Sequence, residues 1–242
     1  MTTTTNAATS ADPTPTGPGA PDAPNGSARE TAEPPAGGAV PAEPADVVDH
    51  LLGVRPGDRL DQIRAGRPEA RANAQKAYEA LLDPVDASDF SRGERLAVAT
   101  FVVGLHGAED VRGFYAARLG AQAGGSGVVD AVEQESARGR GAGPYGVYRE
   151  PGLAGESAPG PAYRVTDRSA LGERLAAALE HAHLLVLRPR EATPEALERL
   201  LAAGWSTTGI VTLSQLVAFL AFQVRVVHGL RQLAVVESEG AH

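Results

Sequence analysis

Hydrophobic residues recur at helical spacing through most of the chain from residue 46 onward. The run SRGERLAVATFVVGLH, residues 91–106, is polar at its start and then almost continuously apolar, so it predicts a central helix. Ser91 is followed three residues later by Glu94, which is the spacing of a capping box. In that motif each side chain accepts a hydrogen bond from the backbone N–H of the other residue. The motif marks the first turn of the helix and gives Glu94 a structural explanation.

Helical spacing, with proline at helix starts and glycine after helix ends, predicts further helices on both sides of this segment. The segments ADVVDHLLG, RPEARANAQKAYEALLDP and the region from Asp167 onward carry helical spacing. Pro68 and Pro194 occupy first-turn positions, whereas Gly53 and Gly204 follow helix ends. Alternating strand patterns do not appear in the sequence, so we predict an all-α protein.

The last helix is predicted to begin at Ser206 or Thr207, and residues on two opposite faces are suited to packing. One stripe holds small residues and two basic ones, and the opposite face is apolar. The stripe comprises Ser214, Ala218, Ala221, Arg225 and His228, and the apolar face comprises Leu216, Leu220, Val227 and Leu230. A small domain has difficulty covering such a helix alone, so we expect a homo-oligomer.

Residues 210–230 are also long enough to cross a bilayer, at roughly 20 residues. However, two glutamines, Arg225 and His228 interrupt the apolar run, and a central arginine is costly in a membrane. We therefore expect a buried helix of a soluble protein and no membrane partner.

The ends and the middle of the chain differ in composition from the helical segments. Residues 1–45 are rich in Pro, Ala, Gly and Thr and predict a disordered tail without the pattern of a secretory signal, so we expect a cytoplasmic protein. Residues 120–166 form a long Gly- and Pro-rich connection, and its three tyrosines indicate that part of it packs on the fold. A helical domain over 46–233 and a disordered C-terminus over 234–242 complete the predicted organisation.

The net charge and the lack of cysteine exclude several classes of function. The formal net charge of −8 disfavours binding to nucleic acid or to an anionic membrane surface. The chain contains no cysteine, which excludes disulfides, thiolate metal sites and cysteine nucleophiles within it. We expect no cofactor and no metal.

Two segments carry a family resemblance. FSRGERLAVATFVVGLHG and AAGWSTTGIVTLSQLVAFLAFQVRVVHGL resemble helices of the carboxymuconolactone decarboxylase and alkylhydroperoxidase D-like superfamily, and the resemblance extends over residues 46–233. It is strongest to a subgroup described only as carboxymuconolactone decarboxylase domain proteins. The resemblance implies a two-part, all-α helical bundle that forms trimers or hexamers.

The redox motif of the peroxidase branch is missing. Aligning the family's LNGC with LHGA places Ala108 and Val111 at the two cysteine positions, Tyr115 at the histidine and Leu96 at the glutamate. An alignment shifted by two residues also supplies no thiol. Peroxide reduction in that branch requires a thiolate, so it is disfavoured here. The decarboxylase branch uses acid–base chemistry on a small lactone acid, which requires no cysteine.

His106 allows two interpretations. As a structural residue it ends a helix and interacts with the helix dipole, Gly107 takes the left-handed position, and Glu109 or Asp110 caps the next helix. As a catalytic residue it is a general acid or base that Glu109 or Asp110 orients, and Tyr115 donates a hydrogen bond to a substrate oxygen. A metal role for His106 would need two more ligands.

Four other basic residues are weaker candidates for a functional role. Arg225 and His228 would clamp a carboxylate or, alternatively, interact with the end of their helix. His181 and His183 lie two residues apart, cannot share a helical face and are expected to be exposed.

Three functional hypotheses follow. The first is a cysteine-free enzyme of the decarboxylase type that transfers a proton on a small organic acid or lactone. The second is a thiol peroxidase by family resemblance only, which the missing cysteines disfavour. The third is a non-catalytic oligomeric subunit or small-molecule binder that partners a cysteine-bearing relative.

Overall fold

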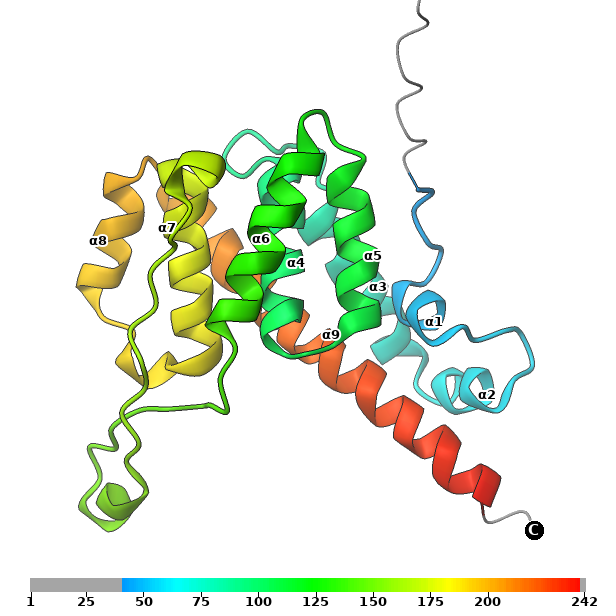
Figure 1. Ribbon diagram of the computed structural model, residues 1–242. Coiled ribbons are helices and arrows are strands. Elements are labelled where there is room, and N and C mark those ends of the chain that lie inside the picture. Colours follow the sequence, from blue (N-terminus) through cyan, green and yellow to red (C-terminus); the bar gives the residue numbers. More distant parts are fainter. Residues whose placement is uncertain (1–40, 240–242) are drawn as a thin grey trace, which may run out of the picture. The chain divides into compact units, whose positions relative to one another are not determined.

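Helices make up almost all the regular structure of the computed structural model, which describes residues 41–239 and the side chains of residues 41–235 (Figure 1). The α-helices are α1 (Val47–Leu52), α2 (Arg59–Ala65), α3 (Pro68–Leu82), α4 (Arg92–Leu105), α5 (Glu109–Gly120), α6 (Gly125–Gly139), α7 (Arg168–Leu187), α8 (Pro194–Ala202) and α9 (Thr207–Glu239). Two short 3-10 helices are η1 (Pro151–Glu156) and η2 (Pro189–Glu191). Within the described residues there is no strand, only one isolated bridge, so the all-α prediction is confirmed.

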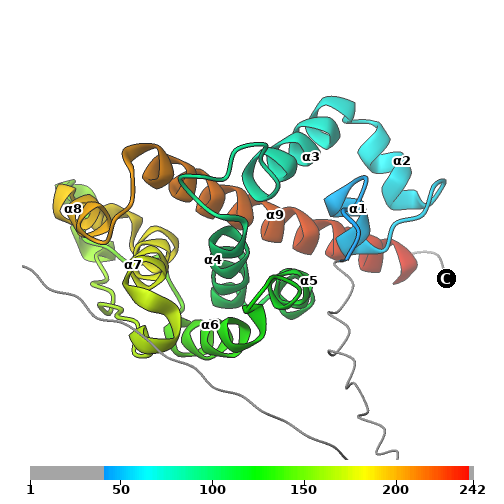
Figure 2. The same ribbon diagram turned by 90° about the horizontal axis from the view of Figure 1, so that it is seen from above.

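α4 lies at the centre of the helices, with α5, α6, α7 and α9 around it (Figure 2). Every residue from Arg95 to Leu105 is buried, which explains why the sequence there is almost continuously apolar. The predicted capping box is present: the Ser91 N–H donates to Glu94 Oε2 at 2.9 Å, and the Glu94 N–H donates to Ser91 Oγ at 3.3 Å. Glu94 also accepts a hydrogen bond from Arg174 of α7 at 2.7 Å, so its contacts are structural.

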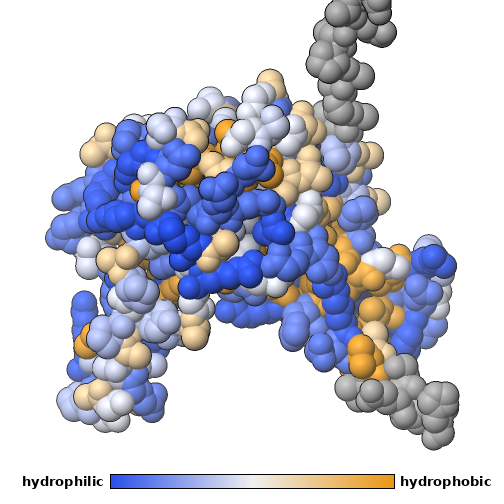
Figure 3. All heavy atoms as spheres, viewed as in Figure 1, coloured by the Kyte–Doolittle hydropathy of each residue, from blue (hydrophilic) through white to orange (hydrophobic). Residues whose placement is uncertain are grey.

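α9 packs against α4, α7, α1 and α3 through its apolar face. Leu216, Leu220 and Val227 of that face are buried, as their spacing predicts. Among the described helices, α9 is the one long and apolar enough to cross a membrane, and 44% of its most apolar window is buried by its neighbours. Hydrophobic residues also gather on the surface where its later turns meet α1 and α2 (Figure 3). The helix continues to Glu239, beyond the predicted domain end at residue 233.

Several boundaries differ from those predicted. Residues 1–40 of the predicted tail lie outside the described part of the chain, and residues 41–45 have no regular structure but contact the helices. Tyr78 donates to Glu43 at 2.6 Å, and Arg118 donates to the carbonyl of Ala42 at 2.9 Å. α2 is not predicted by the hydrophobic pattern, because it is only 7 residues long. Residues 240–242 also lie outside the described residues.

The helical pattern expected at VVDAVEQESA within the 120–166 connection is present as α6, which is longer than that pattern and ends at Gly139. The long irregular part of the connection therefore begins at residue 140. Tyr163 near its end is buried and donates to Glu135 Oε2 at 2.6 Å, which confirms that part of the connection packs on the fold. The middle of the connection projects away from the helices as an arm, closed at its base by the bridge between Gly146 and Ala158 (Figure 1).

The expected exposure of His181 and His183 is wrong. Both are buried, at 5% and 2% exposure, because α7 packs against α4, α6 and α9 and also against α8. His183 stacks on Tyr163 with ring centroids 4.4 Å apart, and its Nε2 lies 3.0 Å from the carbonyl of Gly139. A helix covered on more than one side buries residues that do not share a face.

Candidate functional site

His106 lies at the turn between the central helix and the next one. It follows the last residue of α4 with φ −79°, and Gly107 then takes the left-handed conformation with φ 68°, as predicted. The prediction that Glu109 or Asp110 caps α5 is wrong, because the cap position is Ala108 and has no side-chain hydrogen bond. Both acids instead occupy the first turn of α5, where negative charge is favoured by the helix dipole.

The imidazole of His106 lines two adjacent hollows. The first, which we name the His106 cleft, has a volume of about 620 Å³ and lies between the end of α4, the start of the 140–167 connection, the end of α7 and α9. Its walls combine apolar side chains, small residues and one guanidinium. The lining residues are Leu105, His106, Gly141, Ala142, Gly143, Pro144, Leu185, Val186, Leu187, Pro189, Ser214, Val217, Ala218, Ala221 and Arg225.

The second hollow, which we name the elbow hollow, has a volume of about 590 Å³ and lies between the α4–α5 turn and the later turns of α9. Glu109, Asp110 and His228 line it, together with His106 and Arg225. His106 and Arg225 are therefore common to both hollows. The small-residue stripe predicted on the last helix forms the α9 wall of the His106 cleft, since Ser214, Ala218 and Ala221 of that stripe line it together with Arg225.

Arg225 carries a positive charge with no ion pair among the described residues. Its Nη1 donates to the carbonyl of Ala221 at 2.8 Å, and its side chain is exposed. A guanidinium has five N–H donors, so most of them are free for a ligand. An exposed arginine that lines a partly apolar cleft is suited to binding a carboxylate.

The electrostatics favour a neutral His106. Burial lowers the pKa of this imidazole below its ordinary value, and the nearby positive charge of Arg225 lowers that pKa further. Nε2 of the ring is buried and has no hydrogen-bond partner within the described part of the chain. The interaction with the helix dipole requires the protonated ring, so the lowered pKa weakens that structural explanation.

The two acidic residues predicted to orient His106 have arginine partners instead. Glu109 accepts from Arg112 at 2.8 Å and also pairs with Arg140, and these hydrogen bonds lower the pKa of its carboxyl group, with the Arg140 bond contributing most. Asp110 pairs with Arg231 at 2.8 Å. Both acids lie in the elbow hollow beside His106 but do not hydrogen-bond to it.

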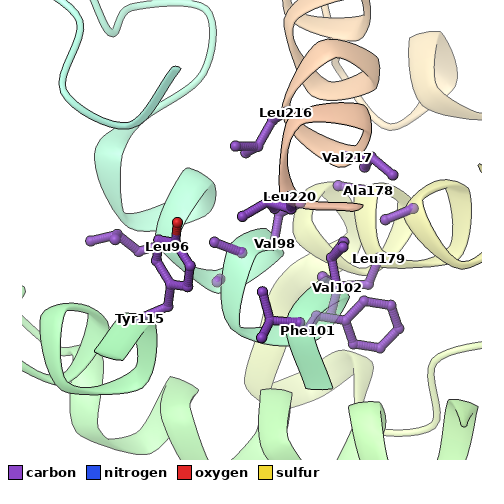
Figure 4. Packing of buried hydrophobic residues seen from close by; sticks show 14 of the residues in the cluster. Leu96, Val98, Phe101, Val102, Tyr115, Ala178, Leu179, Leu216, Val217 and Leu220 are labelled. Carbon is purple, nitrogen blue, oxygen red and sulfur yellow. The ribbon is translucent and has the colours of Figure 1, made fainter. Parts of the chain in front are cut away.

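Tyr115 lies in the core, beside Leu96 of α4 (Figure 4). It is completely buried, lines neither hollow, and its hydroxyl donates to Gln223 Oε1 at 2.6 Å. Burial raises the pKa of this phenol above its ordinary value. The structure thus brings His106 together with Arg225 and not with Tyr115.

A metal centre finds no support in residues 41–235, where no group of three potential His, Asp or Glu ligands occurs. The sequence analysis did not predict that the 140–144 segment and the end of α7 line the His106 cleft. The Gly- and Pro-rich composition of residues 140–144 was the available signal that this chain segment lies close to another element.

Comparison with known proteins adds no family assignment. No protein-family model, curated protein or solved structure matches this chain. The resemblance to the carboxymuconolactone decarboxylase superfamily stays a prediction from the two quoted segments.

Proposed function

We propose that the protein binds a small organic acid, or the lactone of one, in the His106 cleft, and that His106 exchanges a proton with it. The observation that supports this proposal is the convergence of two groups on one cleft of about 620 Å³. One is the half-buried imidazole of His106, and the other is a guanidinium without a carboxylate partner among the described residues.

Arg225 would anchor the carboxylate of the ligand. Charged hydrogen bonds of this kind are stronger than neutral ones, and apolar walls such as Leu187 and Val217 reduce the screening by water. The small side chains of Ala218 and Ala221 leave room for the ligand beside the helix. The cleft is therefore suited to a compact acid with an apolar body.

His106 would act on the ligand as a general base. Its lowered pKa keeps the ring unprotonated at neutral pH, which is the state that accepts a proton. A carboxylate bound to Arg225 would cancel part of the charge that lowers this pKa. Binding would then raise the pKa of His106 toward the working pH, where proton transfer is most efficient.

This proposal fits the cysteine-free decarboxylase branch that the sequence resembles, and the absence of cysteine from the chain disfavours the thiol peroxidase hypothesis. Assembly as a trimer or hexamer and a cytoplasmic location are further parts of the proposal. Exposed apolar side chains on α8 and at the start of α9, Leu201 and Val211 at 50% and 55% exposure, support association with other copies.

One observation favours a second candidate, a binding protein without catalytic activity. No carboxylate or phenol forms a hydrogen bond with His106 among the described residues, and Glu109, Asp110 and Tyr115 all have other partners. A general base usually has such a group to orient it. In this alternative the cleft binds the same acid and the chain serves as a subunit beside a catalytic relative.

The first experiment measures the binding of a panel of small 2-oxo acids and lactones by calorimetry. Arg225→Gln should weaken the binding of an acid by about tenfold or more, because the charged hydrogen bonds are lost. Arg149→Gln removes the same charge from an exposed position outside both hollows and should leave binding unchanged. Equal affinity in the wild type and Arg225→Gln would refute the anchoring role.

A second experiment requires no ligand. The pKa of His106, measured by NMR and assigned with His106→Gln, should rise in Arg225→Gln and stay constant in Arg149→Gln. Once a substrate is found, His106→Gln should lower turnover by about 100-fold or more while the acid still binds. Turnover that survives this substitution would refute the catalytic role of His106, and binding without any turnover would favour the non-catalytic alternative.

A further inference from the structure

A separate groove lies between the later turns of α9 and the three N-terminal helices. It has a volume of about 450 Å³, within the range of small-molecule sites, and we name it the arginine-rimmed groove. Apolar and small residues form most of its surface, and four arginines lie among them. The lining residues are Val48, Ile63, Arg64, Arg67, Ala70, Arg71, Ala74, Phe222, Arg225, Val226, Gly229, Leu230 and Leu233.

The apolar part of this groove is open to solvent. Figure 3 shows hydrophobic residues gathered where α9 passes α1 and α2. Phe222 and Leu233 are 49% and 38% exposed, although large apolar side chains are favoured in the interior. A contiguous apolar surface of this kind marks a binding site more often than isolated exposed residues do.

The arginines divide into two pairs with different surroundings. Arg64 and Arg71 both form ion pairs with Asp46 and Asp49 of the α1 region, so their charges are largely compensated. Arg67 and Arg225 form no ion pair among the described residues, and no Asp or Glu lines the groove. Two uncompensated cations therefore lie beside an apolar surface, on a chain whose overall charge is −8.

We propose that the arginine-rimmed groove binds an amphipathic carboxylate of the fatty-acid type, with the hydrocarbon chain along α9 and the carboxylate on Arg67. Charge complementarity selects this ligand class: a carboxylate gains charged hydrogen bonds from Arg67 that an uncharged hydrophobic molecule cannot form, and a hydrophobic cation would be repelled. The inference does not depend on the proposed function. The two sites share only Arg225, so that residue is kept out of the tests below.

Titration calorimetry with dodecanoate, at concentrations below those at which it forms micelles, tests the ligand class. Dodecanoate should bind more tightly than decanoate, by up to about fourfold for each added methylene, because each one buries further apolar surface. Dodecanol should bind at least about tenfold more weakly than dodecanoate, and dodecyltrimethylammonium should not bind. Equal binding of the alcohol and the carboxylate would overturn the role of the arginines.

Two matched pairs of variants locate the site. Ala70→Trp places a large side chain in the groove, whereas Ala72→Trp places it at an exposed position of the same helix outside the groove. Dodecanoate affinity should fall by about tenfold or more in Ala70→Trp and stay constant in Ala72→Trp. Arg67→Gln should also weaken dodecanoate by about tenfold, with Arg149→Gln as the control for the loss of one charge.

The same variants separate this inference from the proposed function. Neither Ala70 nor Arg67 lines the His106 cleft or the elbow hollow, so both variants should bind small acids as the wild type does. Dodecanoate affinity that is unchanged in both Ala70→Trp and Arg67→Gln would overturn the groove as its site. Absence of dodecanoate binding to the wild type, combined with a smaller oligomer in Ala70→Trp, would show that another copy covers the groove and would also overturn the proposal.

Discussion

Tyr115→Phe tests whether this tyrosine stabilises the fold or acts on a substrate. The Tyr115 hydroxyl of α5 donates to Gln223 Oε1 of α9 at 2.6 Å, and both side chains are completely buried. Nε2 of Gln223 has no partner within the described residues. Removal of the phenol oxygen therefore leaves the whole Gln223 amide buried without a hydrogen bond.

The expected loss of stability follows from that geometry. A buried polar group that loses its partner costs about 1–3 kcal/mol, and Gln223 has no solvent or second donor to compensate. Gln223→Leu should cost less than Tyr115→Phe, since it also removes the unpaired Nε2. The double variant Tyr115→Phe with Gln223→Leu replaces both partners by apolar groups. It should be more stable than the sum of the single losses predicts, with a coupling free energy of about 1–3 kcal/mol.

Urea unfolding followed by far-UV circular dichroism measures these free energies. Tyr148→Phe is the control, because the Tyr148 hydroxyl has no hydrogen bond among the described residues, and it should change the free energy of unfolding by less than about 0.5 kcal/mol. The structural reasoning would be refuted if Tyr115→Phe left stability unchanged and lowered turnover. That result would restore Tyr115 to the catalytic role predicted from the sequence.

Two further predictions concern stability. Burial raises the pKa of Glu135, but the hydrogen bonds from Thr166, Tyr163 and Arg138 together outweigh burial and lower the pKa from 4.5 to about 2. Because the folded-state pKa lies below the unfolded value, this carboxylate stabilises the fold by about 3 kcal/mol above pH 4.5, and the contribution disappears as the pH falls to about 2. In thermal unfolding, the advantage of the wild type over Glu135→Gln should shrink across that range, and a constant difference would contradict the assignment. At Gly125, a Cβ atom would lie 2.0 Å from the Leu119 carbonyl oxygen, so Gly125→Ala should destabilise by at least about 2 kcal/mol in urea unfolding. Gly127→Ala on the same helix meets no atom within 4 Å and should be neutral or slightly stabilising, and equal effects at the two positions would exclude the steric explanation.

The sequence alone determined the features that depend on neighbouring residues. The capping box of Ser91 and Glu94, the first-turn position of Pro68 and the left-handed Gly107 are all confirmed. Each of these features involves backbone groups only a few residues apart. The number of residues between such groups fixes how far apart they lie in a helix or turn, so the sequence is enough to predict them. The continuous apolar run of α4 also indicated a central helix, because a helix surrounded by others is buried on every face.

Only the tertiary structure decided which of the candidate residues meet. Tyr115 follows His106 closely in the sequence, yet its hydroxyl donates a hydrogen bond to Gln223, which lies 108 residues further along the chain. His106 instead shares its hollows with Arg225 of α9. Helical spacing assigns residues to a face, but the packing of α9 and α7 around α4 determines what that face meets. His181 and His183 were mispredicted for this reason, because burial depends on neighbours from other helices and not on the residue's own helix.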